Sequence, residues 1–142
     1  MRPIKTLKMV KILLVEDNVI IRSTISDLVG LEDDFSVEAQ ADNGRIALEL
    51  IENGLSVDVI VTDINMPEMD GIELTKCIVE MNQGIKVIIL TMHDKRAYFD
   101  RAFAAGANGY LLKNGDMEEL YSAIIKVNNG ETVVGLDISL NE

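Results

Sequence analysis

The sequence has few of the residues that stabilise small secreted domains or form aromatic binding surfaces. Only one of its 142 residues is a cysteine, Cys77, so the chain cannot form an internal disulfide. A single thiol favours a reducing compartment, and we therefore expect the cytoplasm. Tryptophan is absent and aromatic residues make up 4% of the chain, so no cluster of aromatic anchors marks a protein-binding surface.

Long apolar runs and an excess of basic residues are also missing. The longest apolar stretches have the length of a strand, as at 87–90, whereas a membrane span needs roughly 18 to 20 residues. The 13 Lys and Arg residues stand against 24 Asp and Glu residues, which gives a net charge of -11. Such a surface repels nucleic acid. We expect neither membrane insertion nor direct DNA contact by this segment.

Length and composition fit one globular domain. A chain of 142 residues with 48% hydrophobic residues can bury a core without metal or disulfide support. Residues 1–8 are basic but lack the apolar core of a signal peptide, and we interpret them as a short leading arm. We expect the folded domain at 9–130, followed at 131–142 by a tail or the start of a linker.

Short runs rich in β-branched residues predict the strands. In four of them the apolar residues are nearly continuous, as is typical of parallel strands covered on both faces. A fifth run alternates more and predicts an edge strand. The four runs are 11–15, 57–61, 86–90 and 109–112, and the alternating run is 35–41.

Segments with helical spacing of apolar residues lie between the strands. They fall at about 21–29, 46–51, 74–81 and 117–125. Asp70 with Glu73 predicts a capping box, and Asn114 precedes an acidic first turn. Taken as five strand–helix units, the alternation predicts an α/β fold: a flavodoxin-like, doubly wound, five-stranded parallel sheet of order 2-1-3-4-5 with five helices.

Polar residues follow the predicted strands at the edge where such sheets bind ligands. Glu16 and Asp17 follow the first strand, Asp63 the third, Thr91 the fourth and Lys113 the fifth. Two carboxylates about 4 Å apart repel by on the order of 4 kcal/mol at an effective dielectric near 20, so a cation is needed. Oxygen ligands without a Cys or His cluster favour a hard ion, and Mg²⁺ better than Ca²⁺.

These residues resemble the receiver domain of two-component response regulators. The resemblance rests on Glu16-Asp17, the segment 63–71, Thr91, Tyr110 and Lys113, and it covers about residues 9–130. It implies that an aspartate, Asp63 here, accepts a phosphoryl group from a sensor histidine kinase or a phosphotransfer protein. Such a protein is a regulatory phosphoacceptor and catalyses only its own phosphorylation and dephosphorylation.

The resemblance also implies how the metal is held. Asp17, Asp63 and the backbone carbonyl of Asn65 would bind Mg²⁺, with Mn²⁺ as an alternative ion. Glu16 would act through a metal-bound water.

A switch follows from the same resemblance. Lys113 would pair with one phosphoryl oxygen and Thr91 would hydrogen-bond another. Movement of Thr91 would vacate space for Tyr110 to turn toward the core, which would shift the population between two states. We expect a surface near the fourth helix and fifth strand to change, and a homodimer to form on phosphorylation.

His93, Asn65 and Met92 are candidate modulators of the site. His93 lies two residues after Thr91, and we hypothesise that His93 and Asn65 set how readily water reaches the acyl phosphate. Met92 stands where many receivers carry alanine, and its bulk would narrow access to the site. Asn114 stands where many receivers carry proline.

Three segments are similar to receivers that carry a LuxR-type helix-turn-helix output domain: 91–93, 109–114 and 129–132. We therefore expect a receiver portion of a transcription regulator, in which a helix-turn-helix domain outside this chain binds DNA. A stand-alone, single-domain signalling receiver is the alternative.

Two other functions use related chemistry. Aspartate-dependent phosphatases commonly place a second acid two residues after the nucleophile, where this chain has Asn65. A flavin- or nucleotide-binding module needs a phosphate cradle after the first strand. Glu16-Asp17-Asn18 would repel phosphate there unless a metal intervened.

Overall fold

The computed structural model describes residues 9–135. The expected leading arm, 1–8, and the segment 136–142 lie outside the described residues, so those predictions stay as they were. The strands are β1 (Val10–Val15), β2 (Phe35–Ala41), β3 (Val59–Thr62), β4 (Lys86–Thr91), β5 (Gly109–Leu112) and β6 (Val133–Val134). The helices are α1 (Val19–Gly30), α2 (Gly44–Glu52), α3 (Gly71–Met81), α4 (Arg96–Ala105) and α5 (Met117–Asn128). Within 9–135 no helix is both long and apolar enough to cross a bilayer.

All strand pairs are parallel, and the order across the sheet is β2-β1-β3-β4-β5-β6. This confirms the predicted order 2-1-3-4-5 and the five helices. The sixth strand was not predicted. It has two residues, Val133 and Val134, which pair with Gly109 and Tyr110 of β5. A run of two residues is too short to show a periodic pattern.

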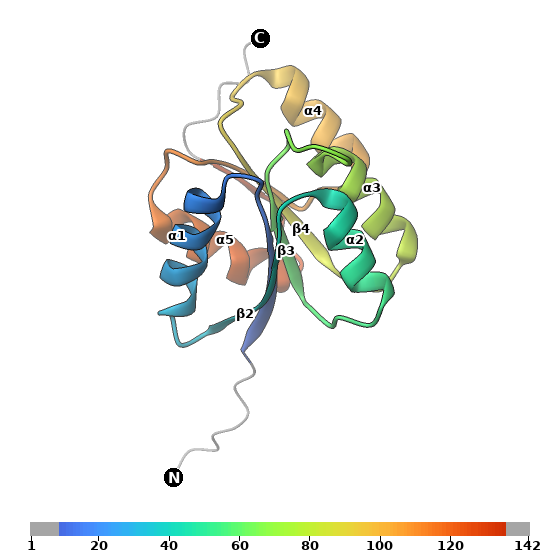
Figure 1. Cartoon of the computed structure of the whole chain (residues 1–142). Coiled ribbons are helices and arrows are strands. Elements are labelled where there is room, and N and C mark those ends of the chain that lie inside the picture. Colours follow the sequence, from blue (N-terminus) through green and yellow to red (C-terminus); the bar gives the residue numbers. More distant parts are fainter. Residues whose placement is uncertain (1–8, 136–142) are drawn as a thin grey trace.

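Helices cover both faces of the sheet, α1 and α5 on one face and α2, α3 and α4 on the other (Figure 1). Alternate residues of β1 supply the two cores. Leu13 and Val15 pack toward α2, α3 and α4, whereas Ile12 and Leu14 pack toward α1 and α5. All four are buried, which stabilises the fold by roughly 1.5–3 kcal/mol per side chain. Burial on both faces explains the nearly continuous apolar runs in the sequence.

Polar side chains fix where the helices begin. The predicted capping box is present: Asp70 accepts from the N–H of Glu73 at 2.8 Å, and the Glu73 carboxylate accepts from the N–H of Asp70 at 3.0 Å. At α5 the prediction was wrong by two residues. The N-cap is Asp116 rather than Asn114, because Asn114 lies in a turn closed by the N–H of Gly115 donating to Leu112.

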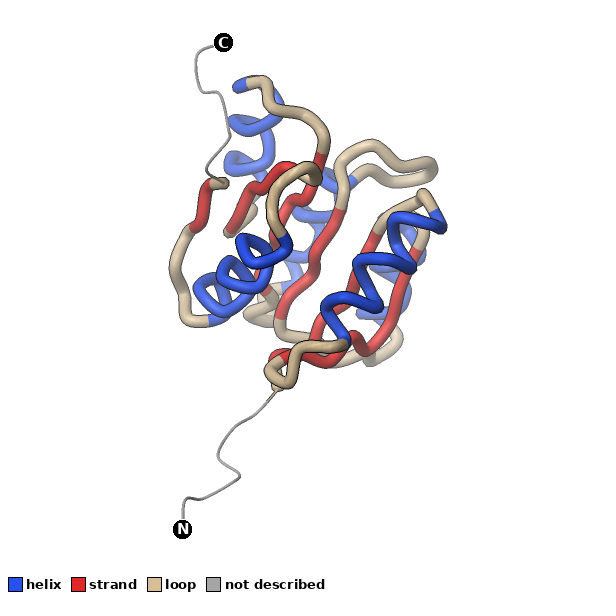
Figure 2. Tube along the Cα trace, turned by 90° about the vertical axis from the view of Figure 1, so that its left-hand side faces the viewer, coloured by secondary structure: helices blue, strands red, loops and turns tan. Residues whose placement is uncertain are grey.

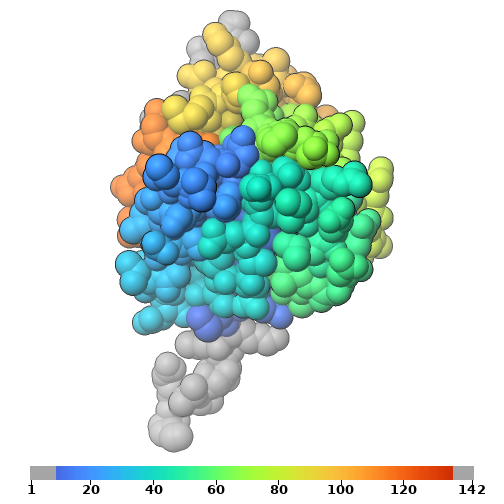
Figure 3. All heavy atoms as spheres, viewed as in Figure 1, coloured from blue at the N-terminus to red at the C-terminus, as the bar shows by residue number. Residues whose placement is uncertain are grey.

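Hydrogen bonds continue one residue beyond the strands and place the residues that follow them. Glu16 donates its N–H to the carbonyl of Ala41, and Asp63 donates to the carbonyl of Val15. In the same way Lys113 donates to Thr91 at 2.8 Å. Loops connect the strands to helices at the two ends of the sheet (Figure 2). The loops after β1, β3, β4 and β5 appear as blue, green, yellow and orange atoms along the upper edge of the molecule (Figure 3).

Candidate metal centre at the carboxyl ends of the strands

Three carboxylates meet at this edge of the sheet. Glu16, Asp17 and Asp63 each offer one oxygen, and these oxygens lie within 4.8 Å of one another. Glu16 is 3% exposed and Asp63 is largely buried, whereas Asp17 is exposed. The group is therefore open to solvent on the side of Asp17. A set of oxygen donors with room for water fits Mg²⁺.

Lys113 partly neutralises this group. Its Nζ lies 2.5 Å from Oε1 of Glu16 and 2.9 Å from Oδ2 of Asp63. Burial would lower the pKa of Lys113, but the hydrogen bonds and charges of Glu16 and Asp63 raise it above its ordinary value. Burial raises the pKa of Glu16, although Lys113 opposes that change. One ammonium faces three carboxylates, so the group can still attract a cation.

Neighbouring residues hold Glu16 from several sides. In addition to its contact with Lys113, the Glu16 side chain accepts at Oε2 from the N–H of Asn18 at 3.0 Å. The backbone carbonyl of Glu16 accepts from Nη1 of Arg22 at 2.7 Å. Asn18 also caps α1 by accepting from the N–H of Ile21. Neither Asn18 nor Arg22 was predicted to hold Glu16 in place.

Asp63 is fixed by its side chain and by its backbone. Oδ1 accepts from the N–H of Ile64 at 2.7 Å, while Oδ2 accepts from Lys113. The first residue of α3, Gly71, donates its N–H to the carbonyl of Ile64 and lies against the Asp63 backbone. A Cβ at position 71 would lie 1.9 Å from the Asp63 carbonyl oxygen, so a larger residue cannot fit without moving that backbone.

Four other predicted residues form a second group beside the loops after β3 and β4: Asn65, Thr91, His93 and Tyr110. The Nδ2 of Asn65 lies 2.6 Å from Nε2 of His93. The backbone N–H of His93 donates to the hydroxyl of Thr91 at 3.2 Å, and its carbonyl accepts from the hydroxyl of Tyr110 at 2.7 Å. The His93 ring stacks on Tyr98 with 4.0 Å between ring centroids. Sequence reasoning missed Tyr98, because a stacking contact leaves no spacing pattern.

Within this second group, Thr91 and Tyr110 are both fully buried. Tyr110 therefore already lies in the core, a position that was predicted for it only after phosphorylation. Burial raises the pKa of Tyr110, and the negative charge of Asp94 raises it further. The Tyr110 hydroxyl therefore stays protonated and can donate a hydrogen bond. Met92 is 65% exposed. Its expected effect on access to the site stays a prediction.

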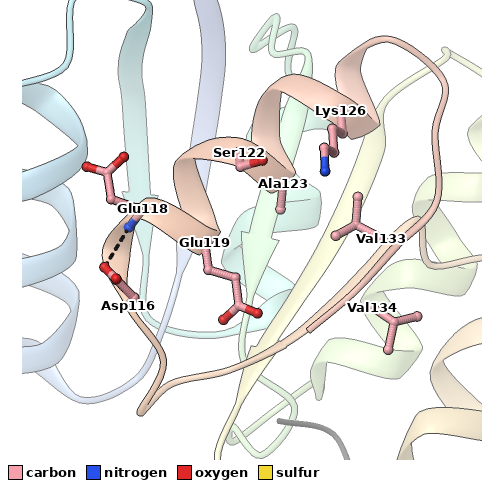
Figure 4. Close-up of a pocket in the computed structure, with 8 residues that line it drawn as sticks. All are labelled: Asp116, Glu118, Glu119, Ser122, Ala123, Lys126, Val133 and Val134. Carbon is pink, nitrogen blue, oxygen red and sulfur yellow. Dashed lines mark hydrogen bonds between the residues drawn. The ribbon is translucent and has the colours of Figure 1, made fainter. Parts of the chain in front are cut away.

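A separate groove of about 450 Å³ lies between α5 and β6 (Figure 4). It is lined by Asp116, Glu118, Glu119, Ser122, Ala123, Lys126, Val133 and Val134. None of these residues belongs to the carboxylate group or to the group around His93. The polar chemistry predicted from the sequence therefore lies elsewhere, at the ends of β1, β3, β4 and β5.

Comparison with known proteins identifies the family of this arrangement. The family model for the response regulator receiver domain matches residues 12–125. The chain is 32% identical to the transcriptional regulatory protein DegU of Brevibacillus brevis over 93% of its length, and 36% identical to UhpA of Escherichia coli over 93%. It spans 56% of DegU and 65% of UhpA, so these relatives are considerably longer.

Solved structures agree with the family model. A two-component response regulator of the LuxR family from Aurantimonas sp. SI85-9A1 superposes with a TM-score of 0.86 at 32% identity, covering 92% of this chain and 93% of that one. The signal receiver domain of the response regulator NarL from Mycobacterium tuberculosis gives 0.83 at 29% identity, covering 87% and 99%. The chain therefore belongs to the response regulator receiver domain family.

Proposed function

We propose that Asp63 accepts a phosphoryl group in a Mg²⁺-dependent reaction, from a sensor histidine kinase or a phosphotransfer protein. One observation carries this proposal. The Asp63 carboxylate lies among Glu16 and Asp17 with Lys113 hydrogen-bonded to its Oδ2. The group thus combines the nucleophilic carboxylate oxygen of Asp63, the ammonium of Lys113 and further carboxylate oxygens that can bind Mg²⁺.

The transfer needs placement and charge neutralisation more than covalent help. A carboxylate oxygen of Asp63 forms a bond to phosphorus while the phosphorus–nitrogen bond of the donor phosphohistidine breaks. The imidazole leaves with the bonding electron pair. Mg²⁺, held by Asp17, Asp63 and the Asn65 carbonyl and through water by Glu16, would neutralise charge on the phosphoryl oxygens.

The residues around Asp63 would then respond to its phosphorylation. Lys113 pairs with a phosphoryl oxygen, since its Nζ already contacts Asp63. The Thr91 hydroxyl, which accepts from the His93 N–H, moves to donate its own proton to another phosphoryl oxygen. The backbone of His93 connects this change to the Tyr110 hydroxyl, which donates to the His93 carbonyl. The surface near α4 and β5 changes as a result.

The output of the switch is transcription. Relatives such as DegU and UhpA are named transcriptional regulatory proteins and are longer than this chain. We place the receiver at 9–130 and a tail or the start of a linker at 131–142, although Val133 and Val134 of that segment still pair with β5 as strand β6. A helix-turn-helix domain in the longer protein would bind DNA in the cytoplasm, and phosphorylation would favour a homodimer.

The test is incubation with acetyl phosphate and Mg²⁺ followed by intact mass measurement. We expect the wild type to gain one phosphoryl group and Asp63→Asn to gain none. Asp42→Asn is the control, because Asp42 is an exposed acid that follows β2. Labelling of Asp63→Asn, or no labelling of the wild type, would contradict the proposal. Steady turnover of phosphomonoesters would favour the phosphatase alternative.

A further inference from the structure

Arg22 stands at a position that ordinary helix energetics disfavours. It lies in the first turn of α1, where the helix dipole opposes a positive charge. Its own N–H donates to the carbonyl of Asn18 within the helix, and its Nη1 donates to the carbonyl of Glu16 at 2.7 Å. The side chain is half-buried. An interaction outside the helix therefore determines where this guanidinium lies.

The carbonyl that Arg22 binds belongs to the peptide group between Glu16 and Asp17. This group is planar, so fixing the oxygen also fixes the direction in which the chain enters Asp17. The backbone N–H of Glu16 is also held, because it donates to the carbonyl of Ala41 in β2. The exposed carboxylate of Asp17 depends on this backbone for its placement, because Asp17 follows directly.

We propose that Arg22 is a positioning residue for the acidic group: it orients the Glu16–Asp17 peptide and thereby aims both carboxylates at the metal position. The inference rests on the proposed function, because it assumes that these carboxylates hold Mg²⁺. Arg22 acts through backbone geometry and touches neither the metal nor the phosphoryl group.

A purely electrostatic role for Arg22 would have the opposite consequence. A fixed positive charge close to the site repels a second cation, so its removal would tighten Mg²⁺ binding. Loss of a positioning residue would weaken Mg²⁺ binding, because the carboxylates would no longer converge. The direction of the change in affinity therefore distinguishes the two roles.

The experiment is calorimetric titration of Mg²⁺ into the whole chain and its variants. We expect Arg22→Gln to raise the Kd for Mg²⁺ by about tenfold, which is typical for loss of a partner that orients a metal ligand. Arg22→Lys should lie between this value and the wild type, because an ammonium can donate one bond but lacks the planar fork. Arg45→Gln is the matched control, since it removes one positive charge from an exposed pair with Glu49.

A second readout needs no metal. In nuclear magnetic resonance spectra of the metal-free protein, Arg22→Gln should shift the amide signals of residues 16–18, whereas Arg45→Gln should not. A Kd for Arg22→Gln equal to or lower than that of the wild type would overturn the inference. If Arg22→Gln does not fold, Arg22→Lys decides: a raised Kd supports the inference and an unchanged one overturns it.

The same experiment separates this inference from the proposed function. Wild-type protein that binds no Mg²⁺ would contradict the proposed function. The metal-free amide shifts would then still decide whether Arg22 holds the turn at residues 16–18.

Discussion

Lys113 is the residue on which the charge balance of the site depends. Its Nζ bridges Glu16 and Asp63, and its side chain is 11% exposed. Removing one member of a buried ion pair leaves the partner's charge desolvated and uncompensated, which costs roughly 3–5 kcal/mol. Here the remaining carboxylates also repel one another, so a bound divalent cation can take over part of the role of Lys113.

We therefore expect Lys113→Met to lower the free energy of unfolding by about 3 kcal/mol in the presence of a chelator. Mg²⁺ should restore part of this loss. Urea denaturation measures both effects, and Lys76→Met, at an exposed position on α3, is the control. Equal stability of Lys113→Met and Lys76→Met would show that the bridge does not stabilise the fold.

The contact between Asn65 and His93 joins the two loops beside Asp63 at 2.6 Å. Without the His93 ring, both Asn65 and Tyr98 lose a partner and the approach of water becomes easier. We expect His93→Ala to shorten the lifetime of the acyl phosphate several-fold, measured as loss of the phosphorylated mass over time. An unchanged lifetime would exclude His93 from this role.

The sequence predicts some of these residues and misses others for a physical reason. Asp63 and Lys113 follow strands directly, so the register of the sheet alone brings them together. Asn18 donates its backbone N–H to the Glu16 carboxylate, and Tyr98 stacks on the His93 ring; strand register determines neither contact. Arg22 could have been noticed for one reason. It places a positive charge in the first turn of a helix, where the helix dipole opposes it.

At the scale of elements, the packing of α3 against β3 decides how Asp63 is presented. α3 begins at Gly71, directly against the backbone of Asp63, and the Asp70–Glu73 capping box fixes this start. The loop 63–70 is therefore held at both ends. Even one methyl group at position 71 requires the two elements to separate.

We expect Gly71→Ala to destabilise the fold by about 2 kcal/mol or more, as overpacking does, and to slow phosphorylation of Asp63. Gly30→Ala is the control. Gly30 lies in α1, and an added Cβ there meets no atom within 4 Å. Alanine is a better helix former, so this variant should be as stable as the wild type or more stable. Stability and phosphorylation at wild-type level in Gly71→Ala would contradict the close approach.

The predicted elements agree with the structure to different degrees, and the differences have identifiable causes. The runs 35–41 and 109–112 coincide with β2 and β5. β3 begins two residues later than the run at 57–61, because the Asp58 carboxylate, rather than a backbone carbonyl, accepts the N–H of Lys11. The helix at Arg96–Ala105 was expected only from the alternation of strands and helices, since no apolar stripe marked it.

At the scale of the whole molecule, the acidic surface and the carboxylate group connect metal binding to stability. The net charge of -11 favours accumulation of cations near the protein. A ligand that binds only the folded chain stabilises it by about 2.7 kcal/mol at a concentration of 100 times its Kd. The proposed site therefore makes Mg²⁺ a global stabiliser.

We expect saturating Mg²⁺ to raise the thermal midpoint of the wild type and to have a clearly smaller effect on Asp17→Asn. Asp33→Asn is the control, because Asp33 is an exposed acid between α1 and β2. The three proteins are compared by calorimetry at constant ionic strength. A similar increase in all three would mean that Mg²⁺ acts through general screening of charge.

The short strand β6 ties the end of the described chain to β5. The N–H of Gly135 donates to the carbonyl of Tyr110, and the N–H of Val133 donates to the carbonyl of Asn108. Any displacement of Tyr110 along its strand must stretch or break the first of these bonds. The exchange rate of the Gly135 amide proton with deuterated solvent therefore reports on the position of β5 without any change to the sequence.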